Sequence, residues 1–239
     1  MTARVAAVVS VAAGLCVCLG QAATKAPTPP APQPTTQPVV VKPPKPDVVP
    51  LVWQLKIEHE PLRSIQVRLP GKKKPQLFWY LRYTVTNQSG EDHIFIPEFI
   101  LYTDSGQVIR AGRSVPTAVF YQIKKLHKDP LQKTHTAMTG KMLLGQDNAK
   151  TGVAIWEDFD PEAGELDIFI GGLSGETKAM PLPKPIKAVE VDLRGRKKMV
   201  MKTRVLLAKT LRLHYSIPGE ASARPGVRPK LVKEDWVMR

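Results

Sequence analysis

Three carboxylates at alternating positions are the first residues of this sequence whose spacing could do chemistry. Asp158, Asp160 and Glu162 form an acidic run in a chain whose formal net charge is +14. Oxygen ligands at every second position are typical of a calcium loop, but an EF-hand glycine would come one residue before Gly164, and no bidentate Glu follows. We expect a solvated loop between two strands, with adventitious calcium binding as the alternative.

Basic clusters are the second group of chemically suggestive residues. They occur at three places, which are Lys72 with Lys73 and Lys74, Lys124 with Lys125, and Arg194 with Arg196, Lys197 and Lys198. Each cluster adjoins a Gly or Pro turn or a polar helix face, which is typical of solvated surface. If they converge on one side, they would bind a polyanion such as an acidic glycan, a wall polymer or lipid headgroups, and salt would weaken the binding steeply. No aromatic residues interleave with them, so we expect no nucleic acid partner.

Signatures of catalysis or metal binding are not found. The Gly-Leu-Ser-Gly run around Ser174 resembles a nucleophile elbow, but Glu176 stands where that motif needs glycine. The five histidines are scattered, and both cysteines, Cys16 and Cys18, lie in the apolar N-terminal segment. We therefore expect a protein that is not an enzyme and that holds no cofactor or metal.

The N-terminus predicts export. A short positive start precedes residues 5–19, which are apolar or small apart from one serine, and small side chains stand where a signal peptidase requires them. We expect a signal peptide over residues 1–22, cleaved after Ala22 or Ala23, and hence a periplasmic or extracellular protein. The alternative is a retained membrane anchor, because the next charge after the positive start is Lys25.

Residues 23–50 form a proline-rich segment. Proline stands at nearly every second or third position, and the segment has no aromatic residue. It cannot bury a core, and its composition favours extended polyproline II backbone. We expect a linker that holds the folded domain away from a membrane or wall surface, or else a passive disordered tail.

The following residues are patterned for β-strands. Residues 77–86 alternate between two faces, with Trp79 and Tyr83 on one face and Phe78 and Tyr80 on the other. We expect the first face to pack in the core. The second face would cover another sheet or line an exposed sugar-binding surface.

Turn signals separate the further strands. A turn cluster predicts a hairpin between residues 77–86 and residues 93–97, and Asp104-Ser105-Gly106 predicts a turn between two more strands. Later strands are predicted at residues 152–156, 166–171, 187–193, 199–207 and 210–217. Residues 194–198 supply the turn between two of them.

A single helix interrupts this pattern. It is predicted over residues 116–127, with Ser114 as its N-cap and Pro116 as its first helical residue. Many short strands with one helix indicate an all-β chain, and specifically a β-sandwich rather than a parallel α/β sheet. We expect the sandwich domain over residues 51–217, and an edge strand or loosely docked tail over residues 218–239.

Several of these stretches resemble bacterial exported immunoglobulin-like (telokin-like) domains. The resemblance covers residues 77–173. The stretches that carry it are residues 81–90 (LRYTVTNQSG), 99–106 (FILYTDSG), 144–146, 152–156 and 166–170. Their pattern of strand, Asn turn, strand and Asp-x-Gly implies an immunoglobulin-like β-sandwich with a binding or adhesion role, and it brings no catalytic residues.

These observations predict an exported, non-catalytic β-sandwich protein of the cell envelope. Its role would be binding or structural, and its partner an unknown protein or an anionic envelope polymer. The alternative is a dedicated polyanion-binding module. A membrane contact is expected only if the N-terminal segment is retained.

Overall fold

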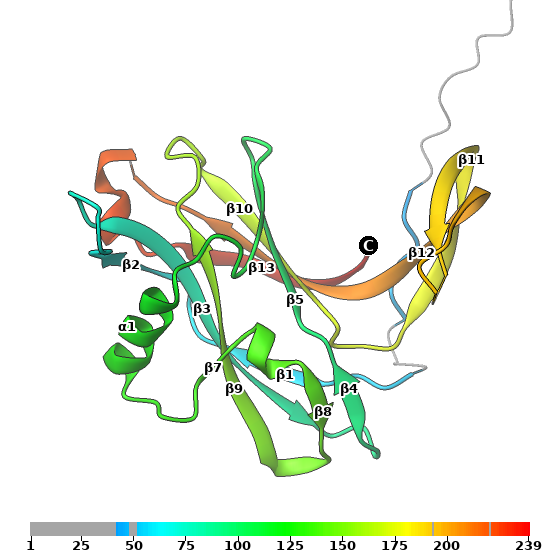
Figure 1. Cartoon of the computed structure of the whole chain (residues 1–239), viewed down its shortest axis with the longest axis horizontal. Coiled ribbons are helices and arrows are strands. Elements are labelled where there is room, and N and C mark those ends of the chain that lie inside the picture. The colour runs from blue at the N-terminus through cyan, green and yellow to red at the C-terminus, as the bar shows by residue number, and fades with distance from the viewer. Residues whose placement is uncertain (1–41, 48–51, 193, 220) are drawn as a thin grey trace, which may run out of the picture. The chain divides into compact units, whose positions relative to one another are not determined.

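The computed structural model describes residues 42–47, 52–192, 194–219 and 221–239, which form mostly antiparallel strands and one α-helix (Figure 1). The predicted signal peptide and most of the proline-rich segment lie outside the described residues. The prediction of a mostly β chain with one helix is confirmed. No helix in the described part is long and apolar enough to span a membrane.

The first sheet is built on β3 (Gln76–Asn87). On one edge it pairs with β1 (Lys56–His59) and β2 (Arg63–Val67), and on the other with β9 (Gly145–Glu157). A short parallel strand, β7 (Lys133–Thr134), adds to β9. Both edges of β3 are therefore occupied along most of its length.

The second sheet is built on β12 (Lys197–Ser216), whose 20 residues are one continuous strand. Its other strands are β10 (Glu165–Gly171), β5 (Glu98–Thr103), β6 (Val108–Arg110), β11 (Thr177–Val191) and β13 (Lys230–Met238). β10 and β11 follow one another along one edge of β12, and β13 lies along the other edge. β5 pairs with β10 and carries β6 at the outer edge.

The two sheets pack face to face around one core. Its large side chains come from both sheets, with Trp79 and Tyr83 on β3, Trp156 on β9, Phe99 on β5 and Tyr215 on β12, all at most 2% exposed. Inward side chains alternate with outward ones, as in other β-sandwiches. The predicted inner face of β3 is confirmed.

The helix α1 (Thr117–His127) covers the outer face of the first sheet. Val119 and Ile123 pack against Phe78 and Tyr80 in a second apolar cluster, and those two aromatic rings are 3% and 2% exposed. The predicted helix is confirmed. The alternative of an exposed sugar-binding surface on this face is wrong, because the helix covers the rings.

The predicted cap of this helix is wrong. Pro116 itself is the N-cap, with extended backbone and no capping side chain. Ser114 has φ of +60°, a left-handed conformation that turns the chain two residues before the cap. The helix ends at His127 and is followed by its C-cap Lys128, whose φ of +53° is also left-handed.

Two strand predictions are corrected. β4 (His93–Phe95) pairs with β8 (Gly140–Met142) rather than with β3, because β3 already has neighbours on both edges. The turn after β3 is nevertheless built by Asn87, whose Nδ2 donates to the carbonyl oxygen of Glu91 at 2.8 Å. The strands predicted at residues 199–207 and 210–217 are one strand, since the β12 pairing continues through Ala208.

Candidate functional site

Residues 181–204 form a two-stranded ribbon, which we call the arm. In this part β11 and β12 pair with each other alone, whereas residues 209–216 of β12 lie between β10 and β13. Figure 1 shows the yellow and orange strands leaving the sheet together. At roughly 3.3 Å per residue, the start of β12 at Lys197 lies about 40 Å along the strand from Lys209.

The tip of the arm is a turn ordered by Asp192. Its Oδ1 accepts the backbone N–H groups of Arg194 and Arg196, each at 2.9 Å, and its Oδ2 accepts Arg196 Nε at 2.6 Å. The backbone N–H of Arg196 is the main cause of a lowered pKa of Asp192. Gly195 has φ of +77°, which favours glycine at this position. The described residues of the tip are therefore ordered around Asp192, and their basic side chains are exposed.

The arm is strongly cationic. Between residues 181 and 204 the sequence has eight Lys or Arg and two acids, a net formal charge of +6. Asp192 pairs with Arg196, and Glu190 lies 3.5 Å from Lys202. Within the described residues, no ion pair involves the other six basic side chains of the arm, which are Lys184, Lys187, Arg194, Lys197, Lys198 and Arg204.

One face of the arm is also apolar. The register sets Val189 opposite Met199, and residues directly opposite in an antiparallel pair share a face. Val191 and Met201 lie on the same face, where Lys187 and Lys197 flank them. The four apolar side chains are 54–61% exposed, so the described structure leaves this face uncovered.

The other predicted basic clusters lie elsewhere. Lys72, Lys73 and Lys74 are exposed in the loop between β2 and β3, which belong to the first sheet. In Figure 1 this loop and the tip of the arm stand at opposite sides of the domain. Lys124 and Lys125 lie on α1. The structure therefore does not bring these clusters together with residues 194–198.

The acidic run forms a loop between β9 and β10, and its carboxylates do not converge. Asp158 accepts the indole N–H of Trp79 at 2.7 Å, and Asp160 accepts the backbone N–H of Glu162 at 3.0 Å. The guanidinium of Arg224 lies 4.6 Å from the centroid of the Phe159 ring. The carboxylates of Asp158, Asp160 and Glu162 act on its charge. Among the described residues, no group of three or more His, Cys, Asp or Glu could hold a metal ion.

A buried ion pair between Glu176 and Lys209 lies where the arm joins the sandwich, and we call this place the root of the arm. The sequence did not reveal this pair. Glu176 Oε2 lies 2.9 Å from Lys209 Nζ, and the two residues are 2% and 3% exposed. Glu176 follows the run that resembles a nucleophile elbow, and its partner is 33 residues away along the chain. Only the pairing of β11 with β12 brings these two residues together.

The same ion pair holds the end of the proline-rich segment. Glu176 Oε1 accepts the backbone N–H of Asp47 at 3.0 Å, and Lys178 Nζ lies 2.9 Å from the Asp47 carboxylate. The Asp47 N–H is the main cause of a lowered pKa of Glu176. Lys209 also lies 5.5 Å from the ring centroid of Trp236 on β13. Asp47, one of the described residues of the predicted linker, is thus held at the root of the arm.

Comparison with known proteins found no match among family models, curated proteins or solved structures. Within the described residues, the arm is the feature whose charge and exposure most strongly indicate a binding role. The buried ion pair joins the arm to the sandwich, and the paired strands present the cations along its length.

Proposed function

We propose that this chain is an exported, non-catalytic attachment module of the cell envelope that binds an anionic envelope polymer through its arm. The immunoglobulin-like topology of its sandwich and its periplasmic or extracellular location are parts of this proposal. The signal peptide predicted from the N-terminal sequence supports the location, and the shared core of two mainly antiparallel sheets supports the topology.

The observation that carries the proposal is the density of cations on the arm, with a net formal charge of +6 over residues 181–204. Side chains on one face of a strand repeat at about 6–7 Å. This spacing is shorter than the Debye length of about 8 Å at physiological ionic strength, so neighbouring cations act on a polymer together. Binding would release counterions and would therefore weaken as salt rises.

A protein partner is the second candidate, and the exposed apolar face of the arm favours it. An isolated two-stranded ribbon is only marginally stable in water, so covering Val189, Met199 and Met201 would stabilise the arm. A complex formed through that face would be driven by apolar burial, which salt does not screen. Salt dependence therefore separates the two candidates.

The test compares two charge-reversal variants of the full chain on beads that carry a carboxylated polysaccharide. Lys197→Glu with Lys198→Glu changes the tip of the arm. Lys72→Glu with Lys73→Glu makes the same change of charge in the loop before β3. We expect the tip variant to bind at least about tenfold more weakly and its salt slope to fall by about two, because each contacting cation releases about one counterion.

The loop variant is the matched control, and its binding should stay within about twofold of the original chain. Equal losses in both variants would show that net charge alone governs binding, and would overturn the proposal. Binding to the polysaccharide that does not change between about 50 and about 500 mM salt would show that counterion release does not drive it, and would also overturn the proposal.

A further inference from the structure

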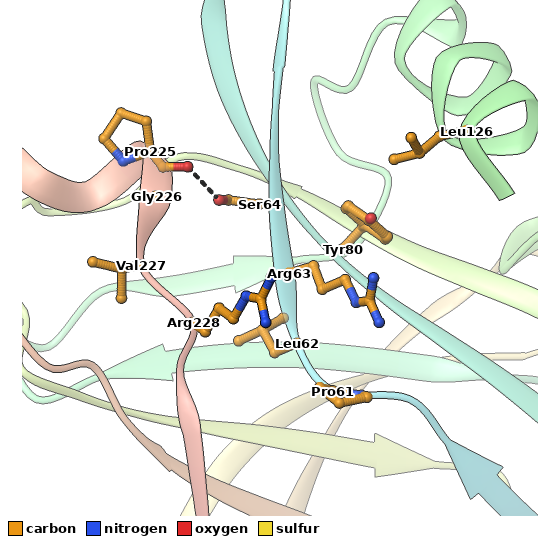
Figure 2. A pocket seen from close by; sticks show the side chains of 10 residues that line it. All are labelled: Pro61, Leu62, Arg63, Ser64, Tyr80, Leu126, Pro225, Gly226, Val227 and Arg228. Carbon is orange, nitrogen blue, oxygen red and sulfur yellow. Dashed lines mark hydrogen bonds between the residues drawn. The ribbon is translucent and has the colours of Figure 1, made fainter.

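A cavity of about 350 Å³ lies where the start of β2, the end of α1 and the segment before β13 meet (Figure 2). Its apolar wall includes Leu62, Leu126 and Val227, and its polar groups include Arg63, Arg228 and Tyr80. Small-molecule sites typically measure about 300–1,000 Å³. The cavity is thus large enough for a small organic molecule.

Two guanidinium groups give this cavity its charge. Arg63 comes from β2 and Arg228 from the segment that leads into β13. Figure 2 shows the two side chains reaching the cavity from different parts of the chain. Within the described residues neither makes an ion pair, whereas the nearby Arg82 is held by Glu60 and Asp129. Arg63 and Arg228 therefore have no ion-pair partner in the described structure, and the nearest carboxylates, Glu60 and Asp129, are bound to Arg82.

The strand segments around the cavity are held in place. Ser64 donates its hydroxyl proton to the carbonyl oxygen of Pro225 at 3.2 Å, which ties β2 to the short helix η2 (Ala221–Gly226). Figure 2 shows this bond on the side of the cavity away from α1. The two arginines consequently project from segments that are hydrogen-bonded to each other.

Tyr80, the third polar group of the cavity, is joined to Arg82 through His127 by hydrogen bonds. These bonds determine the protonation of His127. Arg82 Nη1 lies 3.1 Å from Nδ1 of His127, and a guanidinium can only donate. Nδ1 must therefore accept, so His127 is neutral with its proton on Nε2. Burial and then the charge of Arg82 lower the pKa of His127, in agreement with a neutral ring.

The Nε2 proton of His127 determines the direction of its hydrogen bond with Tyr80. Nε2 lies 3.0 Å from the Tyr80 hydroxyl oxygen, so the imidazole donates and the hydroxyl accepts. The hydroxyl proton of Tyr80 is not used in this bond. Tyr80 lines the cavity and is 2% exposed, so that proton is a donor for a ligand at the cavity wall.

The cavity thus combines two guanidinium forks and a hydroxyl donor with an apolar wall. We propose that it binds a small molecule that carries one carboxylate or phosphate on an apolar body, with Arg63 and Arg228 on the oxyanion and Tyr80 donating to it. Guanidinium forks match the geometry of both oxyanions. This site is separate from the arm and does not depend on polymer binding.

The test titrates the full chain with benzoate, phenylphosphate and neutral benzamide at low salt, followed by NMR of the backbone amides. We expect one of the two anions to bind at least about tenfold more tightly than benzamide, with shifts at residues 61–64 and 226–228. The ratio between benzoate and phenylphosphate distinguishes a carboxylate from a phosphate site.

Substitution of Arg63 and Arg228 tests whether these two residues form the binding site. Arg63→Gln with Arg228→Gln should weaken anion binding at least about tenfold. Arg68→Gln with Arg113→Gln removes the same charge from exposed positions outside the cavity, and this control should bind within about twofold of the original chain. Equal losses in the two variants, or no binding of either anion at millimolar concentration, would overturn the proposal. The tip variant of the arm should bind the anions normally.

Discussion

Two histidines should make the free energy of unfolding depend on pH. Burial is the main cause of a lowered pKa for both His127 and His135. In the unfolded chain these rings would take up a proton near pH 6.5. In the folded protein they stay neutral to lower pH, so the unfolded state binds more protons as the pH falls below 6.5.

We therefore expect the free energy of unfolding to fall as the pH drops through 6.5, before the carboxylates with lowered pKa, such as Glu176 and Asp235, begin to be protonated. Urea unfolding between about pH 5 and about pH 8 measures this. The double variant His127→Gln with His135→Gln should lose most of the slope between pH 5 and pH 6.5. If the variant keeps the same slope, the histidines are not its cause.

At the residue scale, the acidic run shows why spacing alone predicts little about a metal site. Asp158 and Asp160 alternate as calcium ligands do, but the strands around them turn each carboxylate to a different partner. Asp158 meets Trp79, 79 residues away, and Asp160 meets its own loop. The sequence pattern carries no information about these partners, because the contact with Trp79 depends on how β3 and β9 pair.

At the scale of elements, the root of the arm depends on the buried pair of Glu176 and Lys209. Replacing Glu176 by Gln would leave the Lys209 ammonium buried without a counter-charge. We expect this change to lower the free energy of unfolding by about 3 kcal/mol, because breaking a buried ion pair leaves one charge uncompensated. Chemical denaturation followed by tryptophan fluorescence measures this.

The matched control replaces both partners at once. Glu176→Met with Lys209→Met removes both charges and keeps similar volumes, so it should cost clearly less than Glu176→Gln alone. A double variant that is less stable than the single variant would show that the attraction between the two charges outweighs the cost of burying them.

Local patterns predicted most single elements correctly. The two faces of β3, the extent of α1 and the turn at Asp104-Ser105-Gly106 all depend on neighbouring residues, and the structure has them as expected. The pairing of β4 could not be predicted, because it depends on which edges of β3 are already taken by distant strands. Non-local pairing is decided by the whole fold rather than by a turn signal.

The candidate site was predictable only in part. The sequence predicted a turn at residues 194–198 between two strands, and the structure has a turn there that ends earlier, because Lys197 and Lys198 already belong to β12 and pair with Val191 and Glu190. It did not reveal that these strands leave the sandwich, because the alternation of Val189, Val191, Met199 and Met201 is the same in a buried strand and in an exposed ribbon. Burial decides between the two, and burial depends on the rest of the fold.

At the scale of the whole molecule, the sandwich and the arm have separate roles. The core cluster lies between the two sheets, and the exposed apolar side chains of the arm do not belong to it. The root holds the arm to the sandwich and also fixes Asp47 at the end of the proline-rich segment. We therefore propose that the sandwich provides the stability of the protein and that the arm binds the polymer.

The most direct measurement deletes the arm from the full chain. Met180 and Val205 are paired across the ribbon, so an Asn-Gly turn can replace residues 181–204 and close the hairpin. We predict that this variant unfolds at nearly the same temperature as the original chain but binds a carboxylated polysaccharide at least about tenfold more weakly. Polymer binding that survives in the folded variant would contradict the assignment of the arm as the binding element.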